Sequence, residues 1–196
     1  MAFATDGDDR AGRADSMQHP DLARVAGEMR AEWRAEQEAA TADAVAHWRH
    51  TRTLVDWLRD RMHAGDVVGA RVLEQQFAGR VEEVGPDLVG LRTRQRRVEI
   101  HLDAAIPIAF ELVEHATEGG ARSPNRRAFR DALVARDAQA DVTVATPLCP
   151  AGVSGTLLVG RDFVTVVEPS GLETVVPIAQ IAWVAPGGRD AAAAGL

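Results

Sequence analysis

The stretch VGPDLV at residues 84–89 returns as VGRDFV at residues 159–164. In both copies an apolar segment ends at a glycine, an aspartate follows two positions later, and a second apolar segment begins directly after the aspartate. Gly and Asp are typical turn residues, and apolar segments on both sides of such a turn predict a β-hairpin. The recurrence predicts that the chain builds the same hairpin twice.

Matches on both sides of the hairpin extend this repeat. The matched pairs are Gly79 and Gly155, Asp87 and Asp162, Leu91 and Val166, Leu102 and Ile178, and Ile106 and Ile181. Alternation with a period of two predicts five short strands in each copy, which suits a small closed or nearly closed barrel better than a sandwich. A predicted helix precedes each set of strands, with Leu54 and Leu58 matching Phe129 and Leu133.

A long helix is predicted before the first set of strands. Residues 20–63 are rich in Ala, Glu, Arg and Gln, which favour helix, and contain no proline after Pro20. Apolar residues recur at helical spacing in two stripes, the first formed by Leu22, Val25, Met29 and Trp33 and the second by Val45, Trp48, Val55, Leu58 and Met62. The pattern predicts either one continuous helix or two helices broken near Thr41, with Gly65 as the C-terminal cap.

The expected fold class is therefore α+β, with a long N-terminal helix followed by two helix-plus-five-strand small barrels. The expected segments are a disordered tail (1–19), the long helix (20–63), barrel one (64–114), a linker (115–123), a helix with barrel two (124–185) and a second tail (186–196).

A helix followed by five bent strands, with Gly in the second strand and Asp after the next turn, resembles the Sm-like or SH3-like small barrel. The likeness covers residues 42–185 and is greatest in residues 155–166 (GTLLVGRDFVTV) and 175–181 (VVPIAQI). The chain is also similar to short bacterial proteins with an Arg-rich helix before one such barrel. Sm proteins bind RNA through an Asn after the turn and an Arg-Gly pair between strands four and five. This chain has neither, so the resemblance implies the fold without that RNA site.

Composition and charge argue against a nucleic-acid-binding, a disulfide-bonded and a membrane protein. The chain has 196 residues, 46% of them hydrophobic, and a formal net charge of -7, which disfavours phosphate backbones as partners. The single cysteine, Cys149, excludes an intrachain disulfide. The N-terminal residues lack the pattern of a signal peptide, and the apolar runs are too short to cross a membrane. We expect a soluble, cytoplasmic protein without a membrane partner.

Catalytic and metal-binding patterns are weak throughout. Asp43, His47 and His50 have a spacing that can face one metal, but further ligands are missing nearby. Cys149 has no paired base, and residues 152–156 (GVSGT) lack the final Gly of a nucleophile elbow. Asp87 and Asp162 are expected to accept backbone hydrogen bonds as turn residues. We therefore expect no catalytic residue, cofactor or metal site, and a protein that is not an enzyme.

Two features point to binding instead. The first helical stripe, Leu22, Val25, Met29 and Trp33, lies about 30 residues before the first barrel. This stripe is expected either to fold back on the protein through a break near Thr41 or to pack against a protein partner or a second copy, and we favour self-association. The second feature is a basic cluster at a hairpin tip, formed by Arg92, Arg94, Arg96 and Arg97. It could contact phosphate, or it could be a solvated hairpin neutralised by Glu82, Glu83 and Glu99. The first hypothesis is a non-catalytic binding or assembly protein, and the alternative is a nucleic-acid-binding regulator that uses this tip.

Overall fold

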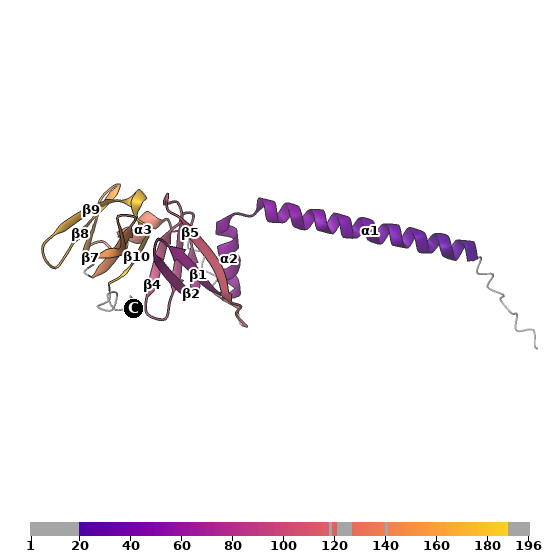
Figure 1. The fold of residues 1–196 in the computed structure, drawn as a ribbon, viewed down its shortest axis with the longest axis horizontal. Helices are drawn as coiled ribbons and strands as arrows, with labels where there is room; N and C mark the ends of the chain where they lie inside the picture. Colours follow the sequence, from indigo (N-terminus) through magenta and orange to yellow (C-terminus); the bar gives the residue numbers. More distant parts are fainter. Residues whose placement is uncertain (1–19, 118, 121–126, 140, 188–196) are drawn as a thin grey trace, which may run out of the picture. The chain divides into compact units, whose positions relative to one another are not determined.

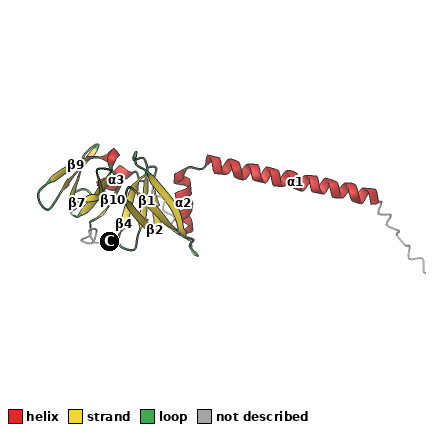
Figure 2. Cartoon of the chain, viewed as in Figure 1, coloured by secondary structure: helices red, strands yellow, loops and turns green. Residues whose placement is uncertain are grey.

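A computed structural model describes residues 20–117, 119–120, 127–139 and 141–187 of the chain. The chain divides after residue 51 into two units. Within the described residues, the first unit is the single helix α1, and the second contains helices α2 and α3 with ten strands (Figures 1 and 2). The predicted tail at residues 1–19 lies outside the described residues.

Helix α1 (Pro20–Thr51) is continuous over 32 residues. Asp21 in its first turn and Arg49 and His50 in its last turn complement the helix dipole. The predicted break near Thr41 is wrong, because the hydroxyl of Thr41 donates to the carbonyl of Gln37 within an unbroken helix.

The helix break falls instead at residues 52–53, between α1 and α2 (Leu54–Ala64). Thr53 and Asp56 form a capping box, in which the backbone N–H of Asp56 donates to the Thr53 hydroxyl and the backbone N–H of Thr53 donates to the Asp56 carboxylate. This cap starts a new helix and divides the predicted segment 20–63 in two. Gly65, at φ 80°, ends α2 as predicted.

Ten strands follow α2 and form one antiparallel sheet. They are β1 (Val67–Val72), β2 (Gln75–Val84), β3 (Leu88–Arg92), β4 (Arg97–His101), β5 (Ile108–Glu114), β6 (Val142–Thr146), β7 (Cys149–Val159), β8 (Phe163–Val167), β9 (Glu173–Pro177) and β10 (Trp183–Pro186). The strand order is β5-β1-β2-β3-β4-β10-β6-β7-β8-β9. A short 3-10 helix, Ile178–Gln180, lies between β9 and β10. β10 includes Pro186, the first residue of the predicted second tail, and residues 188–196 of that tail lie outside the described residues.

The ten strands form one sheet that is not closed, so the fold differs from the two separate barrels that the sequence predicts. The junction between its halves is the pairing of β4 with β10, where Trp183 lies opposite Ile100 and Val184 opposite Glu99. β10 also pairs with β6, so it is hydrogen-bonded on both sides. Strands β5 and β9 form the two ends of the sheet.

The two matched hairpins have the same backbone hydrogen bonds. The N–H of Gly85 donates to the carbonyl of Leu88 at 2.8 Å, and the N–H of Gly160 donates to that of Phe163 at 2.8 Å. The carbonyl of Asp87 accepts from Leu102, and that of Asp162 accepts from Ile178. A Cβ atom at Gly79 or at Gly155 would overlap the backbone of the next strand, at Arg92 and Val167 respectively. These predicted pairs therefore occupy corresponding places in the two hairpins.

Two apolar cores lie against the sheet, and each includes a large side chain from the other half. Leu58 and Met62 of α2 pack in the first core with strands β1 to β4 and with Trp183 of β10. Phe129 and Leu133 pack in the second core with strands β6 to β9 and with Leu88 of β3. Because Trp183 packs in the first core and Leu88 in the second, each core contains side chains from both halves of the sheet.

Helix α3 (Phe129–Val134) carries the second core's helical residues. Residues 124–126, at the start of the predicted segment 124–185, lie outside the described residues. Leu133 is buried like its predicted match Leu58, whereas Phe129 is buried and its predicted match Leu54 is exposed.

Candidate functional site

The first candidate site is the apolar face of α1. Met29 and Trp33 retain 64% and 62% of their surface exposed, and Val25 retains 42%. All three lie at helical spacing along α1, and their exposure shows that the first unit does not cover them. Leu22, predicted to share this face, belongs to α1, but its side chain lies outside the description. Removing the apolar surface of such a face from water by packing it against another element is favourable by about 25 cal/mol per Å² of buried apolar surface.

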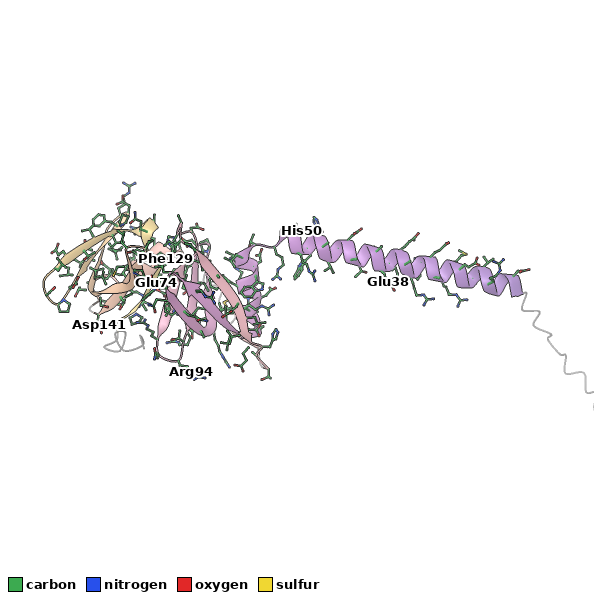
Figure 3. The ribbon with its side chains drawn as sticks, in the orientation of Figure 1. Glu38, His50, Glu74, Arg94, Phe129 and Asp141 are labelled. Carbon is green, nitrogen blue, oxygen red and sulfur yellow. The ribbon has the colours of Figure 1, made fainter. Side chains whose placement is uncertain are left out.

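The second candidate site is the basic hairpin tip between β3 and β4. Arg92 Nε lies 3.1 Å from Glu82 Oε1, and Arg96 lies over the ring of Trp183 at 5.5 Å. Partial burial lowers the pKa of the Arg96 guanidinium. Arg94 is exposed at the tip and has no ion pair among the described residues (Figure 3).

Arg97, the fourth predicted nucleic-acid contact, points into the protein rather than to the tip. It pairs with Glu83, and its Nε lies 3.4 Å from Glu99 Oε1 and its Nη1 3.6 Å from Glu82 Oε2. Arg92 and Arg97 therefore pair with Glu82, Glu83 and Glu99, the three glutamates named in the solvated-hairpin interpretation, but Glu83 and Glu99 are buried rather than solvated. Of the four arginines, Arg94 is the one whose guanidinium is fully available to a ligand.

Glu83 of β2 and Glu99 of β4 lie at the centre of a buried ion network that the sequence predicts only in part. Their surfaces are 3% and 2% exposed. Arg127 Nη2 lies 2.9 Å from Glu83 Oε2 and 2.8 Å from Glu99 Oε1, and Arg136 Nε lies 3.0 Å from Glu99 Oε2. Arg127 and Arg136 flank α3, so the network ties α3 to the first half of the sheet.

The chemistry of this network is structural rather than reactive. A pair of carboxylates can serve as an acid and a base, but that role requires an oxygen free to exchange a proton with a substrate. Here guanidinium groups bind both carboxylates. Burial by itself lowers the pKa of Arg127, but its hydrogen bonds and charge interactions with Glu83 and Glu99 outweigh burial and raise it. The network holds fixed charges in ion pairs.

Asp87 also acts over a longer range than predicted. Its carboxylate Oδ1 accepts the backbone N–H of Phe129 at 2.8 Å. The ring of His101 stacks on that of Phe129 with centroids 4.4 Å apart, and its Nδ1 lies 3.1 Å from the carbonyl of Ile181. The side chain of Asp87 thus joins the first hairpin turn to α3, while its backbone carbonyl accepts the N–H of Leu102.

The remaining predicted chemistry is not brought together by the fold. Among the described residues, no group of three or more His, Cys, Asp and Glu side chains is placed to hold a metal ion, and Asp43, His47 and His50 form no such group. Cys149 is a half-buried free thiol at the start of β7. No helix in the described ranges is long and apolar enough to cross a membrane.

Comparisons with known proteins assign no function to these surfaces. No protein-family model, curated protein or solved structure matches the chain. The resemblance to Sm-like and SH3-like barrels stays a prediction, and the function has to be argued from the surfaces described above.

Proposed function

We propose that this protein is a non-catalytic, cytoplasmic binding and assembly protein that self-associates through α1. The observation that carries the proposal is the exposed apolar face of α1, with Met29 and Trp33 about two-thirds exposed. In proteins most of the stability of a helix comes from packing its apolar face against another element, so the exposed face of α1 indicates a missing partner. A second copy of the chain supplies an identical face.

In this proposal the unit that follows α1 is a binding module derived from two small β-barrels. Its support is the strand order, since β5-β1-β2-β3-β4 in one half corresponds to β10-β6-β7-β8-β9 in the other. The equal hydrogen bonds of the hairpins at Gly85 and Gly160 add to that support. Association through α1 would present several such modules together, which raises their avidity for a repeated partner.

Sedimentation velocity of the full chain tests this proposal. We expect the unmodified chain to sediment as a dimer or larger species, and the variant Met29→Glu/Trp33→Glu to sediment as a monomer. The matched control is Ala31→Glu/Ala35→Glu, which adds the same charge at exposed positions on another face of α1 and is expected to associate normally. A monomeric unmodified chain at high concentration would contradict self-association.

The nucleic-acid alternative rests on one observation, the exposed guanidinium of Arg94 at the hairpin tip. Three of the predicted contacts, Arg92, Arg96 and Arg97, have partners within the protein. This leaves a weak basic surface on an acidic chain, which supports binding to nucleic acid less than the α1 face supports assembly.

A further inference from the structure

We propose that α1 pairs with α1 of a second copy in parallel and in register. This inference rests on the proposed self-association and adds the direction of the pair. It is carried by a four-residue pattern in α1, because residues 28–39 read EMRA-EWRA-EQEA. Since α1 is one unbroken helix with 3.6 residues per turn, residues four apart lie in rows along its surface.

The pattern sorts three kinds of side chain onto three neighbouring rows. Met29 and Trp33 form an apolar row. The row on one side of it is acidic and consists of Glu28, Glu32 and Glu36, and the row on the other side begins with Arg30 and Arg34. A fourth row, on the far side, consists of Ala31, Ala35 and Ala39. The apolar row thus has a negative flank and a positive flank.

Within a single α1 Glu28 is the one member of these charged rows that forms an ion pair among the described residues, with Arg24 at 2.9 Å. Neighbours within the acidic row carry like charges, as do Arg30 and Arg34, and like charges four residues apart destabilise an isolated helix. The Nε atoms of Arg30 and Arg34 donate to backbone carbonyls of their own helix, and neither arginine has an ion pair among the described residues. The same holds for Glu32 and Glu36 within those residues, so a partner can neutralise both flanks.

The direction of pairing decides whether the flanks attract or repel. A two-fold axis parallel to both helices places the negative flank of one helix against the positive flank of the other, on both sides of the apolar row. An antiparallel pair places each flank against the same flank of its partner. Ala26 continues the basic row, and Ala40 and Ala44 continue the acidic row. All three lie on the same face of α1 as Met29 and Trp33, where their small side chains allow the backbones to approach closely.

A charge exchange tests the flanks in the full-length chain. We expect Glu32→Arg/Glu36→Arg to raise the Kd of self-association at least about tenfold, because both flanks then become basic. Mixing this chain with Arg30→Glu/Arg34→Glu should restore association, since one chain then has basic flanks and the other acidic flanks. A Kd that the exchange leaves unchanged would overturn the role of the flanks.

Disulfide trapping tests the direction. In a Cys149→Ser background, single variants Ala26→Cys and Ala40→Cys lie about 21 Å apart along the helix axis. A parallel, in-register pair forms disulfide-linked homodimers at both positions, whereas an antiparallel pair allows them at one position at most. Ala35→Cys, on the far side of the helix, is the control and should not link.

The outcomes separate the two proposals. Homodimers linked at both Ala26→Cys and Ala40→Cys support the parallel pair. An associated chain that links at one position or at neither overturns the parallel pair and leaves self-association standing. A chain that remains monomeric in sedimentation overturns self-association, and the parallel pair with it.

Discussion

The carboxylate of Asp87 accepts the first backbone N–H of α3, from Phe129, at 2.8 Å, although 42 residues separate the two. The residue at the N-cap of α3 is Ala128, whose side chain has no acceptor. Asp87 therefore supplies from a distant hairpin turn the acceptor that a helix normally obtains from its own N-cap. The same contact fixes the start of α3 against the first half of the sheet.

We predict that Asp87→Ala lowers the free energy of unfolding by about 1 kcal/mol, because an N–H at the start of α3 loses its acceptor. Asp87→Asn keeps an acceptor oxygen and should lose less. Asp162→Ala changes the exposed aspartate of the matching turn and is the control. Its free energy of unfolding should be close to that of the unmodified chain. Urea unfolding followed by circular dichroism gives these values, and equal stabilities for Asp87→Ala and Asp162→Ala would refute the capping role.

Asp66 should make stability depend on pH. Burial raises the pKa of its carboxyl, but the N–H of Ala116 at 2.9 Å and the guanidinium of Arg61 at 2.8 Å outweigh burial, and the pKa lies below its ordinary value. His115 lies 3.6 Å away and lowers it slightly further. A pKa that is lower in the folded chain stabilises the fold above the unfolded-state pKa, and this stability is lost as the pH falls through the folded-state pKa.

The matching variant is Asp66→Asn, which removes the charge at nearly constant volume. We expect it to lower the free energy of unfolding by about 1–3 kcal/mol near neutral pH and by less near pH 3. Unfolding curves between about pH 7 and about pH 3 measure this difference. A loss of stability that stays constant across that range would show that the charge of Asp66 contributes nothing.

Glu99→Ala should be among the most destabilising changes to a charged residue in the second unit. It removes the carboxylate that Arg127 and Arg136 bind, which leaves Arg127 with Glu83 alone and Arg136 without an ion pair among the described residues, at a cost of about 3–5 kcal/mol. Glu82→Ala is the control, because Glu82 is more exposed and should cost about 0–1 kcal/mol. If both variants lower the midpoint temperature of thermal unfolding equally, the ion network around Glu99 does not stabilise the fold more than the exposed pair of Glu82 does.

The nucleic-acid alternative has its own test at the hairpin tip. Arg92→Ser/Arg94→Ser removes the two exposed arginines and spares Arg97, which the ion network needs. If the tip binds phosphate, affinity should weaken and the slope of log K against log salt should fall by about one for each phosphate that the variant no longer neutralises. Fluorescence anisotropy with labelled single- and double-stranded oligonucleotides measures both. No binding by the parent chain at low salt would dispose of the alternative.

Local features of the fold could be predicted from the sequence because they depend on nearby residues. The hairpin turns at residues 85–88 and 160–163 and the end of α2 at Gly65 are predicted from residues close together in the sequence, and the structure has both features.

The break between α1 and α2 has a sequence signal that competes with another pattern. Thr53 and Asp56 have the spacing of a capping box, whereas the apolar stripe across residues 45–62 favours a continuous helix. In the structure the capping box forms, and its two hydrogen bonds give the backbone N–H groups of Thr53 and Asp56 side-chain acceptors at the start of α2.

The merged sheet and the ion network could not be predicted in the same way. The exchange of Trp183 and Leu88 between the two cores depends on which strands meet, and no local pattern encodes that meeting. Arg127 and Arg136 reach Glu99 from 28 and 37 residues away, so their partners are identifiable only with the strands in place.

The double pairing of β10 has a consequence for the order in which the chain folds during synthesis. Until residues 183–186 have left the ribosome, β4 has an open hydrogen-bonding edge and the first core lacks Trp183. A nascent chain that ends before this point exposes an unpaired strand, which is the kind of edge that chaperones protect and that other chains can join. The first half of the sheet, although made first, is completed by a segment that is translated only after strands β6 to β9.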